Sequence, residues 1–245
     1  DRLNLLINSS TGSEETSEEV SEEVSEETSE ETSEEHEDFT ESQGLEYTIN
    51  EDKVSYSVTG IGACADTDVV IPNTYENLPV TSIAAFAFEG CANLTSVEIG
   101  EGVTRLDASA FEGCVNLTSV EIGERVTTIA SNAFAGCSKL TFAEYGNCQY
   151  LGNKNNPYVA LIQIKSTEDS TYTIHKETKI IADNAFYRCE LITSITIPDS
   201  VTSIGASALY SCTNLTSVVI GDGITSISEY MFSHCSSLTS MEIPN

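Results

Sequence analysis

Basic residues are scarce in this sequence, where ten Lys and Arg stand against 39 Asp and Glu, giving a formal net charge of −29. Proteins that bind nucleic acid carry basic patches or stripes, so this composition argues against nucleic acid as a partner. An anionic membrane surface is disfavoured for the same reason. No apolar run approaches the roughly 18 residues that cross a bilayer, so we expect no direct membrane insertion.

The sequence also lacks the short motifs that carry chemistry. It contains no Cys-x2–4-Cys pair for a metal, no G-x-S-x-G, no phosphate-binding glycine loop, no EF-hand spacing and no H-E-x-x-H. His234 precedes Cys235, but side chains adjacent in a chain rarely face each other as a catalytic pair must. We therefore predict no catalytic residue, no metal and no cofactor.

The first 44 residues differ in composition from the rest. From Ser13 to His36 the tetrapeptide S-E-E-x repeats six times, and acids four residues apart repel one another on any helix face. We predict a disordered acidic linker over residues 1–44. Two alternatives stay open: an acidic tract that gathers cations, and a modified Ser/Thr-rich stalk. The chain opens on Asp1 and stops within a repeat, so we interpret it as a piece of a longer protein.

A 23-residue period dominates the other 200 or so residues. Cys91, Cys114 and Cys137 are 23 residues apart, and so are Cys189, Cys212 and Cys235. Each closes the phrase A-F-x-x-C or a variant of it, and L-T-S-V-x-I followed by V-T-x-I runs between them. Repetition at such a period predicts a solenoid, here a mainly β array of about seven turns with parallel stacked strands over residues 45–245. An alternating segment at residues 45–67 predicts a β-hairpin that caps its first edge.

Aromatic and cysteine side chains follow the same period. The predicted spine of stacked rings comprises Phe88, Phe111, Phe134, Phe186 and Phe232. The periodic cysteines fit a disulfide framework or a ladder of buried free thiols, and we favour the thiols because cysteine and phenylalanine share the core period.

One unit breaks the period, because Cys137 and Cys189 are 52 residues apart. We assign residues 140–168 to an irregular unit with an insertion, which in repeat arrays maps to a loop on one face. Glu98, Glu121 and Glu144 are predicted as a row of carboxylates on adjacent parallel strands leading into it. The row fits an acidic binding strip or a merely solvated face, and the insertion fits a binding loop or a tolerated excursion. Binding requires Tyr145, Tyr150 and Tyr158 to be exposed, whereas a passive role requires them to be buried.

The repeated phrases resemble the BspA-like, or treponemal-type, leucine-rich repeats. The resemblance covers about residues 45–245 and implies a secreted or cell-surface bacterial protein, with adhesion to host matrix proteins or other cells as the expected activity. The family has no catalytic residues to transfer. We predict a non-catalytic extracellular protein-binding module that acts through its strand face and the inserted loop. The alternative is a passive spacer that displays another domain, and an enzyme with a site in the insertion is least favoured.

Overall fold

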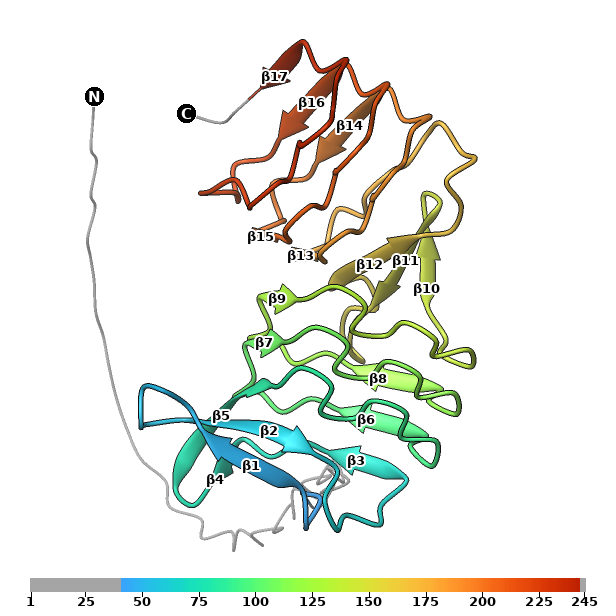
Figure 1. The fold of residues 1–245 in the computed structure, drawn as a ribbon. Helices are drawn as coiled ribbons and strands as arrows, with labels where there is room; N and C mark the ends of the chain where they lie inside the picture. The colour runs from blue at the N-terminus through green and yellow to red at the C-terminus, as the bar shows by residue number, and fades with distance from the viewer. Residues whose placement is uncertain (1–40, 243–245) are drawn as a thin grey trace, which may run out of the picture. The chain divides into compact units, whose positions relative to one another are not determined.

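The structure, a computed structural model, describes residues 41–242, and all of their regular elements are strands (Figure 1). Most of the predicted linker therefore lies outside the described residues. Its last part belongs to the folded unit, because Ser42 is buried and exchanges two hydrogen bonds with Val70. The Ser42 N–H donates to the Val70 carbonyl at 3.1 Å, and the Val70 N–H donates to the Ser42 Oγ at 3.1 Å.

A β-hairpin opens the array. Strands β1 (Glu46–Ile49) and β2 (Tyr56–Gly60) pair antiparallel, and β2 pairs in parallel with β5 (Leu78–Ile83). A short strand, β4 (Thr74–Tyr75), pairs antiparallel with β5. The hairpin thus lies at the end of one sheet of the array, which continues through β7 (Arg105–Leu106) and β9 (Thr128–Ile129).

A second row of parallel strands forms the other wall of the first turns. It contains β3 (Asp68–Val70), β6 (Ser96–Glu98) and β8 (Ser119–Glu121), paired without a register shift. Alternation decides which side chains enter the core: Val97 and Ile99 are buried, whereas Glu98 between them points outward. Val103 and Leu106 are fully buried from the opposite wall. Each turn therefore closes its own section of one continuous apolar core.

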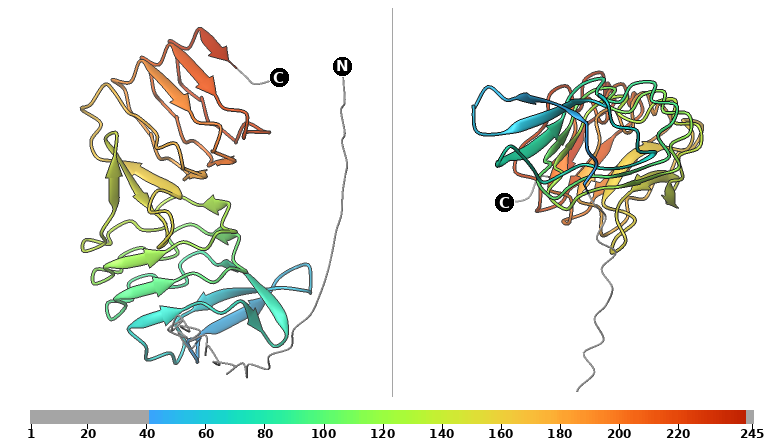
Figure 2. Two further views of the ribbon diagram at one scale, coloured as in Figure 1. Left: turned by 180° about the vertical axis from the view of Figure 1, so that it is seen from behind. Right: turned by 90° about the horizontal axis from the view of Figure 1, so that it is seen from below.

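The same two rows resume in the C-terminal half, which is seen from behind in Figure 2. Strands β14 (Ser194–Ile197), β16 (Ser217–Ile220) and β17 (Ser240–Glu242) make one parallel row. The opposite row contains β13 (Ile180–Ile181) and β15 (Ser203–Ile204). It joins the strands of the irregular unit, β10 (Ala143–Tyr145), β11 (Cys148–Leu151) and β12 (Ala160–Ile164). The array has about eight turns, against about seven predicted.

Phenylalanine rings stack from turn to turn in the first half. Phe88 and Phe111 have ring centroids 5.0 Å apart, and Phe111 and Phe134 are 5.5 Å apart, with nearly parallel planes in both pairs. The stack stops at Phe134. In the second half Phe186 packs edge-on against Tyr172, and Phe232 is only partly buried.

The cysteines are all free thiols. Several donate a hydrogen bond from Sγ to a carbonyl of the preceding turn: Cys114 to Phe88, Cys137 to Phe111, Cys212 to Phe186 and Cys235 to Leu209, at 3.0 to 3.3 Å. Cys114, Cys137, Cys189 and Cys212 are buried, whereas Cys91 and Cys235 are only half-buried. The thiols thus fill space in the core and also donate hydrogen bonds from one turn to another.

The sheet of the irregular unit separates two apolar clusters. On β12, Ala160 belongs to the cluster of the first half and Leu161 to that of the second half. On β13 the neighbours Ile180 and Ile181 divide in the same way. Because successive side chains of a strand point to opposite faces, these strands form a wall with one core on each side.

Candidate functional site: the inserted unit

The irregular unit begins with a tight hairpin. Strands β10 and β11 pair antiparallel, with Tyr145 opposite Cys148, and Gly146 and Asn147 form the two-residue turn. Both turn residues have positive φ, 55° and 65°, as a type I′ hairpin turn requires. A Gly-Asn pair between apolar segments is a recognised hairpin signal, and our sequence analysis missed it.

This hairpin overturns the predicted row of three carboxylates. Glu98 and Glu121 are direct neighbours on β6 and β8, as expected. Glu144, however, lies on β10, which pairs with β11 and not with β8. Gly152 takes the next position beside Glu121, and its carbonyl accepts the Ile122 N–H at 2.8 Å. The prediction that Glu144 continues the row was wrong, because the chain reverses where we assumed a regular parallel strand.

Lysines of the irregular unit lie against the last two carboxylates of the predicted row, Glu121 and Glu144. The Lys154 Nζ is 3.7 Å from the Glu121 carboxylate, and the Lys165 Nζ is 2.7 Å from that of Glu144. The hydrogen bond from Lys165 holds the pKa of Glu144 below its usual range. The unit therefore presents alternating charges at its surface, where the sequence suggested a single acidic strip.

Aromatic side chains from three segments meet beside this hairpin. The rings of Tyr158 and His175 stack with centroids 3.9 Å apart, and Tyr145 meets His175 edge-on at 4.8 Å. Tyr145 is 43% exposed, and Tyr158 and His175 are half-buried. We call Tyr145, Tyr158 and His175 the aromatic cluster. It provides a firm apolar surface on one face of the hairpin, whereas Glu144, the neighbour of Tyr145 on β10, points to the other face.

Tyr150 supports this cluster from below. Its side chain is fully buried, so the prediction that Tyr150 is exposed in a binding surface was wrong. Its hydroxyl accepts the His175 N–H at 3.2 Å, and its ring meets Tyr158 edge-on at 5.5 Å. Burial raises the pKa of Tyr150 well above its usual range, which keeps the hydroxyl protonated. Nothing in the repeat pattern indicated that His175, 25 residues away, would be its partner.

The loop between β11 and β12 is fixed by asparagine side chains. The Asn153 Oδ1 accepts the N–H groups of Asn155 and Asn156, both at 3.0 Å. The Asn156 Nδ2 donates to the Glu177 carbonyl at 3.0 Å, and its Oδ1 accepts the Tyr158 N–H at 2.9 Å. These bonds tie the loop to its own turn and to the next repeat, so Tyr158 enters the cluster in one defined position.

Comparison with known families identifies the array. Residues 62–172 and 165–245 match the BspA type leucine rich repeat region, in six copies. The chain belongs to the BspA-type leucine-rich-repeat family.

Solved structures of bacterial repeat proteins are similar to this BspA-type chain. A leucine-rich-repeat protein of T. pallidum (TpLRR) is 22% identical, with a TM-score of 0.44, over 83% of this chain and 81% of that one. One from Bacteroides ovatus is 24% identical, with a TM-score of 0.42, over 82% of this chain and 52% of that one. A leucine rich cell surface protein of Faecalibacterium prausnitzii is 16% identical, with a TM-score of 0.29, over 82% of this chain and 93% of that one. A comparison with curated proteins gave no match.

A second set of aromatic residues occupies the turns of the later BspA-type repeats. Tyr187 and Tyr210 stack with centroids 5.3 Å apart, and His234 meets Tyr210 edge-on at 5.0 Å. Tyr187 is 43% exposed, and the Arg188 guanidinium lies 5.8 Å from its ring centroid. The repeat pattern contains a signal for this pair that was not used: both tyrosines stand two residues before a periodic cysteine.

Within residues 41–242, no helix is long and apolar enough to span a membrane, and no three His, Cys, Asp or Glu side chains gather as metal ligands.

Proposed function

We propose that this chain is a non-catalytic protein-binding module that acts at the cell surface or outside the cell, and that it binds through the inserted unit. The aromatic cluster is the observation that carries the proposal. Rigid, partly exposed aromatic side chains give large contact area for little loss of conformational entropy, which is why they dominate binding hot spots.

Charges elsewhere on the inserted unit suit a protein ligand. Glu144 and Lys165 supply one charge of each sign on the other face of the hairpin, and exposed charges of this kind steer and orient a partner more than they add affinity. Glu98 and Glu121 are neighbours on the strand face, where Glu121 also lies 3.7 Å from Lys154, and this acidic pair favours a ligand with basic side chains. A host matrix protein or another cell surface is the partner class that the family resemblance implies.

The alternative is a passive spacer, and the buried Tyr150 is the observation that favours it. A spacer needs the insertion packed against its neighbours, and Tyr150 is packed in that way. It does not, however, account for the exposure of Tyr145.

A matched pair of variants tests the proposal. Tyr145→Ala should weaken capture of extracellular matrix proteins and host-cell surfaces by about tenfold or more, as truncation of a hot-spot aromatic does. Tyr187→Ala is the control, because Tyr187 has the same exposed fraction, 43%, and also contacts another ring.

Each result decides between the alternatives. If only Tyr187→Ala weakens binding, the ligand uses the later turns and the inserted unit is not the site. If the native chain captures no ligand from this set, the spacer interpretation replaces the proposal.

A further inference from the structure

Neighbouring turns of the array are joined by hydrogen bonds at the A-F-x-x-C phrase. Alternate N–H groups of one turn donate to carbonyls of the next. Ser109, Phe111 and Gly113 donate to Ser131, Ala133 and Ala135 at 3.1, 2.8 and 2.8 Å. In the second half, Asn184, Phe186 and Arg188 donate to Ala206, Ala208 and Tyr210 at 3.1, 2.8 and 2.9 Å. Every regular step of this ladder therefore has three rungs.

The irregular unit interrupts the ladder, because it has no A-F-x-x-C phrase of its own. Among the described residues, the N–H groups of Asn132, Phe134 and Gly136 donate to no acceptor. The carbonyls that would come next in register, those of Asp183, Ala185 and Tyr187, accept from no donor there. A row of backbone donors and a row of backbone acceptors are thus left without partners inside the array.

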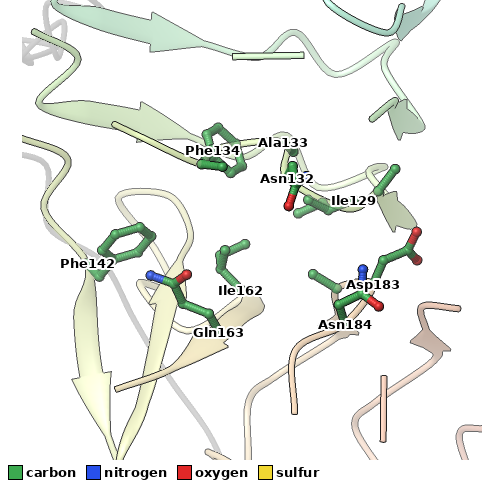
Figure 3. Close-up of a pocket in the computed structure, with 12 residues that line it drawn as sticks. Ile129, Asn132, Ala133, Phe134, Phe142, Ile162, Gln163, Asp183 and Asn184 are labelled. Carbon is green, nitrogen blue, oxygen red and sulfur yellow. The ribbon is translucent and has the colours of Figure 1, made fainter. Parts of the chain in front are cut away.

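A cavity of about 140 Å³ lies between these turns (Figure 3). Asn132, Ala133 and Phe134 line one side of it, Asp183 and Asn184 line another, and Phe142, Ile162 and Gln163 complete the wall. The cavity begins where the ring stack ends. Phe134 is stacked on Phe111 from one side only and is 6% exposed, whereas Phe88 and Phe111 are fully buried.

The gap closes at one end. The Asp183 N–H donates to the Ile129 carbonyl at 3.0 Å. The Asp183 carboxylate accepts the Ala206 N–H at 2.7 Å and also takes a hydrogen bond from the Ser131 backbone. The space therefore does not admit a complete additional repeat. An apolar cavity of about 150 Å³ accepts a benzene ring, and this cavity has about that size. Its lining is mixed: Phe134, Phe142 and Ile162 are apolar, whereas Asn132, Gln163, Asp183 and Asn184 are polar.

We propose that the cavity binds a phenylalanine side chain carried on a peptide turn of a protein ligand. The ring would continue the stack below Phe134, and the adjoining peptide groups would meet the free N–H groups of Asn132, Phe134 and Gly136. This inference rests on the proposed function, the binding of protein by the inserted unit, and it names the chemistry of the ligand. At every regular step, one A-F-x-x-C turn stacks on the next. A ligand for the cavity should therefore have the backbone geometry of such a turn.

An acetylated, amidated peptide SNAFAG, which copies residues 131–136, is a direct probe. Titrated into the ¹⁵N-labelled chain, it should shift the amide protons of Asn132, Phe134 and Gly136 downfield. The amides of Ser109, Phe111 and Gly113 are an internal control, because they already have partners and should not move. The peptide SNAAAG should bind more than tenfold more weakly, because burial of the ring supplies most of the affinity.

Two variants on one strand separate cavity filling from unfolding. Ile162→Phe places a larger side chain in the cavity wall and should abolish the titration. Ile164→Phe is the control, since Ile164 lies two residues along β12, is likewise half-buried and does not line the cavity.

The proposal is overturned if no saturable shift occurs at Asn132, Phe134 and Gly136, or if SNAAAG binds as well as SNAFAG. It is also overturned if the shifts fall on Tyr230, Phe232 and His234, the unpartnered amides of the last described turn. If the peptide fails while Tyr145→Ala still weakens capture of a ligand, only the cavity proposal falls. If the peptide binds and no ligand is captured by the native chain, the proposed function falls and the cavity remains a binding site.

Discussion

Replacing Phe111 with alanine should destabilise the protein more than replacing Phe134, although both rings belong to one stack. Phe111 is fully buried and has a ring on each side, with centroids at 5.0 and 5.5 Å. Phe→Ala in a core costs about 3–5 kcal/mol, and each aromatic pair contributes about 0.5–1.5 kcal/mol beyond burial. We therefore expect Phe111→Ala near the upper end of that range.

Phe134 has one ring neighbour, and the 140 Å³ cavity lies on its other side. Because this space is already unfilled, truncation loses fewer contacts than at a fully packed position. We expect a cost of about 3 kcal/mol, at the lower end of the range. Phe88→Ala is the control, since Phe88 also has a single ring neighbour but is fully buried and does not line the cavity. Its cost should fall between the other two.

Urea unfolding followed by circular dichroism measures the difference. For an m value of about 1–3 kcal/mol per molar urea, a difference of about 1–2 kcal/mol separates the midpoints by roughly 0.3 to 2 molar. The reasoning fails if Phe134→Ala is as costly as Phe111→Ala. Equal costs for Phe88→Ala and Phe134→Ala would show that ring contacts alone set the cost and that the cavity has no effect.

Two further predictions concern the backbone and the thiols. Gly146→Ala should lower the stability measured by thermal unfolding clearly more than Gly90→Ala does. Both glycines have positive φ, so that an added side chain is strained at either position. At Gly146 an added Cβ would also collide with the Thr173 carbonyl oxygen, whereas at Gly90 it would meet nothing within 4 Å. Equal losses would mean that the hairpin adjusts to the side chain. Burial raises the pKa of Cys212 to about 12, so its thiol should resist alkylation at neutral pH. The stability that depends on the protonated thiol should be lost as the pH rises from about 8.5, the ordinary pKa of the unfolded thiol, toward 12. Alkylation followed by mass spectrometry should modify the half-buried Cys64, Cys91 and Cys235 first, and a native bridge between Cys114 and Cys137 would contradict this account.

The regular repeats could be predicted from the sequence because period and burial have the same cause. Each turn must bury the same positions, so Val97, Ile99 and Leu106 are identified by recurrence alone. The irregular unit gave no such information. The spacing of 52 positions from Cys137 to Cys189 fixes how much chain is inserted but not its direction. Glu144 was therefore placed on a parallel strand, and the contact of Tyr150 with His175 was missed.

The same limit applies to the cavity. The polar groups to which the proposed ligand would bind belong to the backbone, and their lack of partners depends on which turns are neighbours in space. A missing A-F-x-x-C phrase is visible in the sequence. That the N–H groups of Asn132 and Phe134 are left without acceptors is visible only once the turns are placed.

The wall formed by β11, β12 and β13 has a consequence for how such a chain changes in evolution. Because the two cores touch opposite faces of the wall, a duplication or loss of one 23-residue unit on either side lengthens or shortens one core without repacking the other. Within the wall, a one-residue deletion exchanges the side chains offered to the two cores and damages both. Related genes should therefore vary in the number of repeats on each flank while keeping the length of the wall strands unchanged.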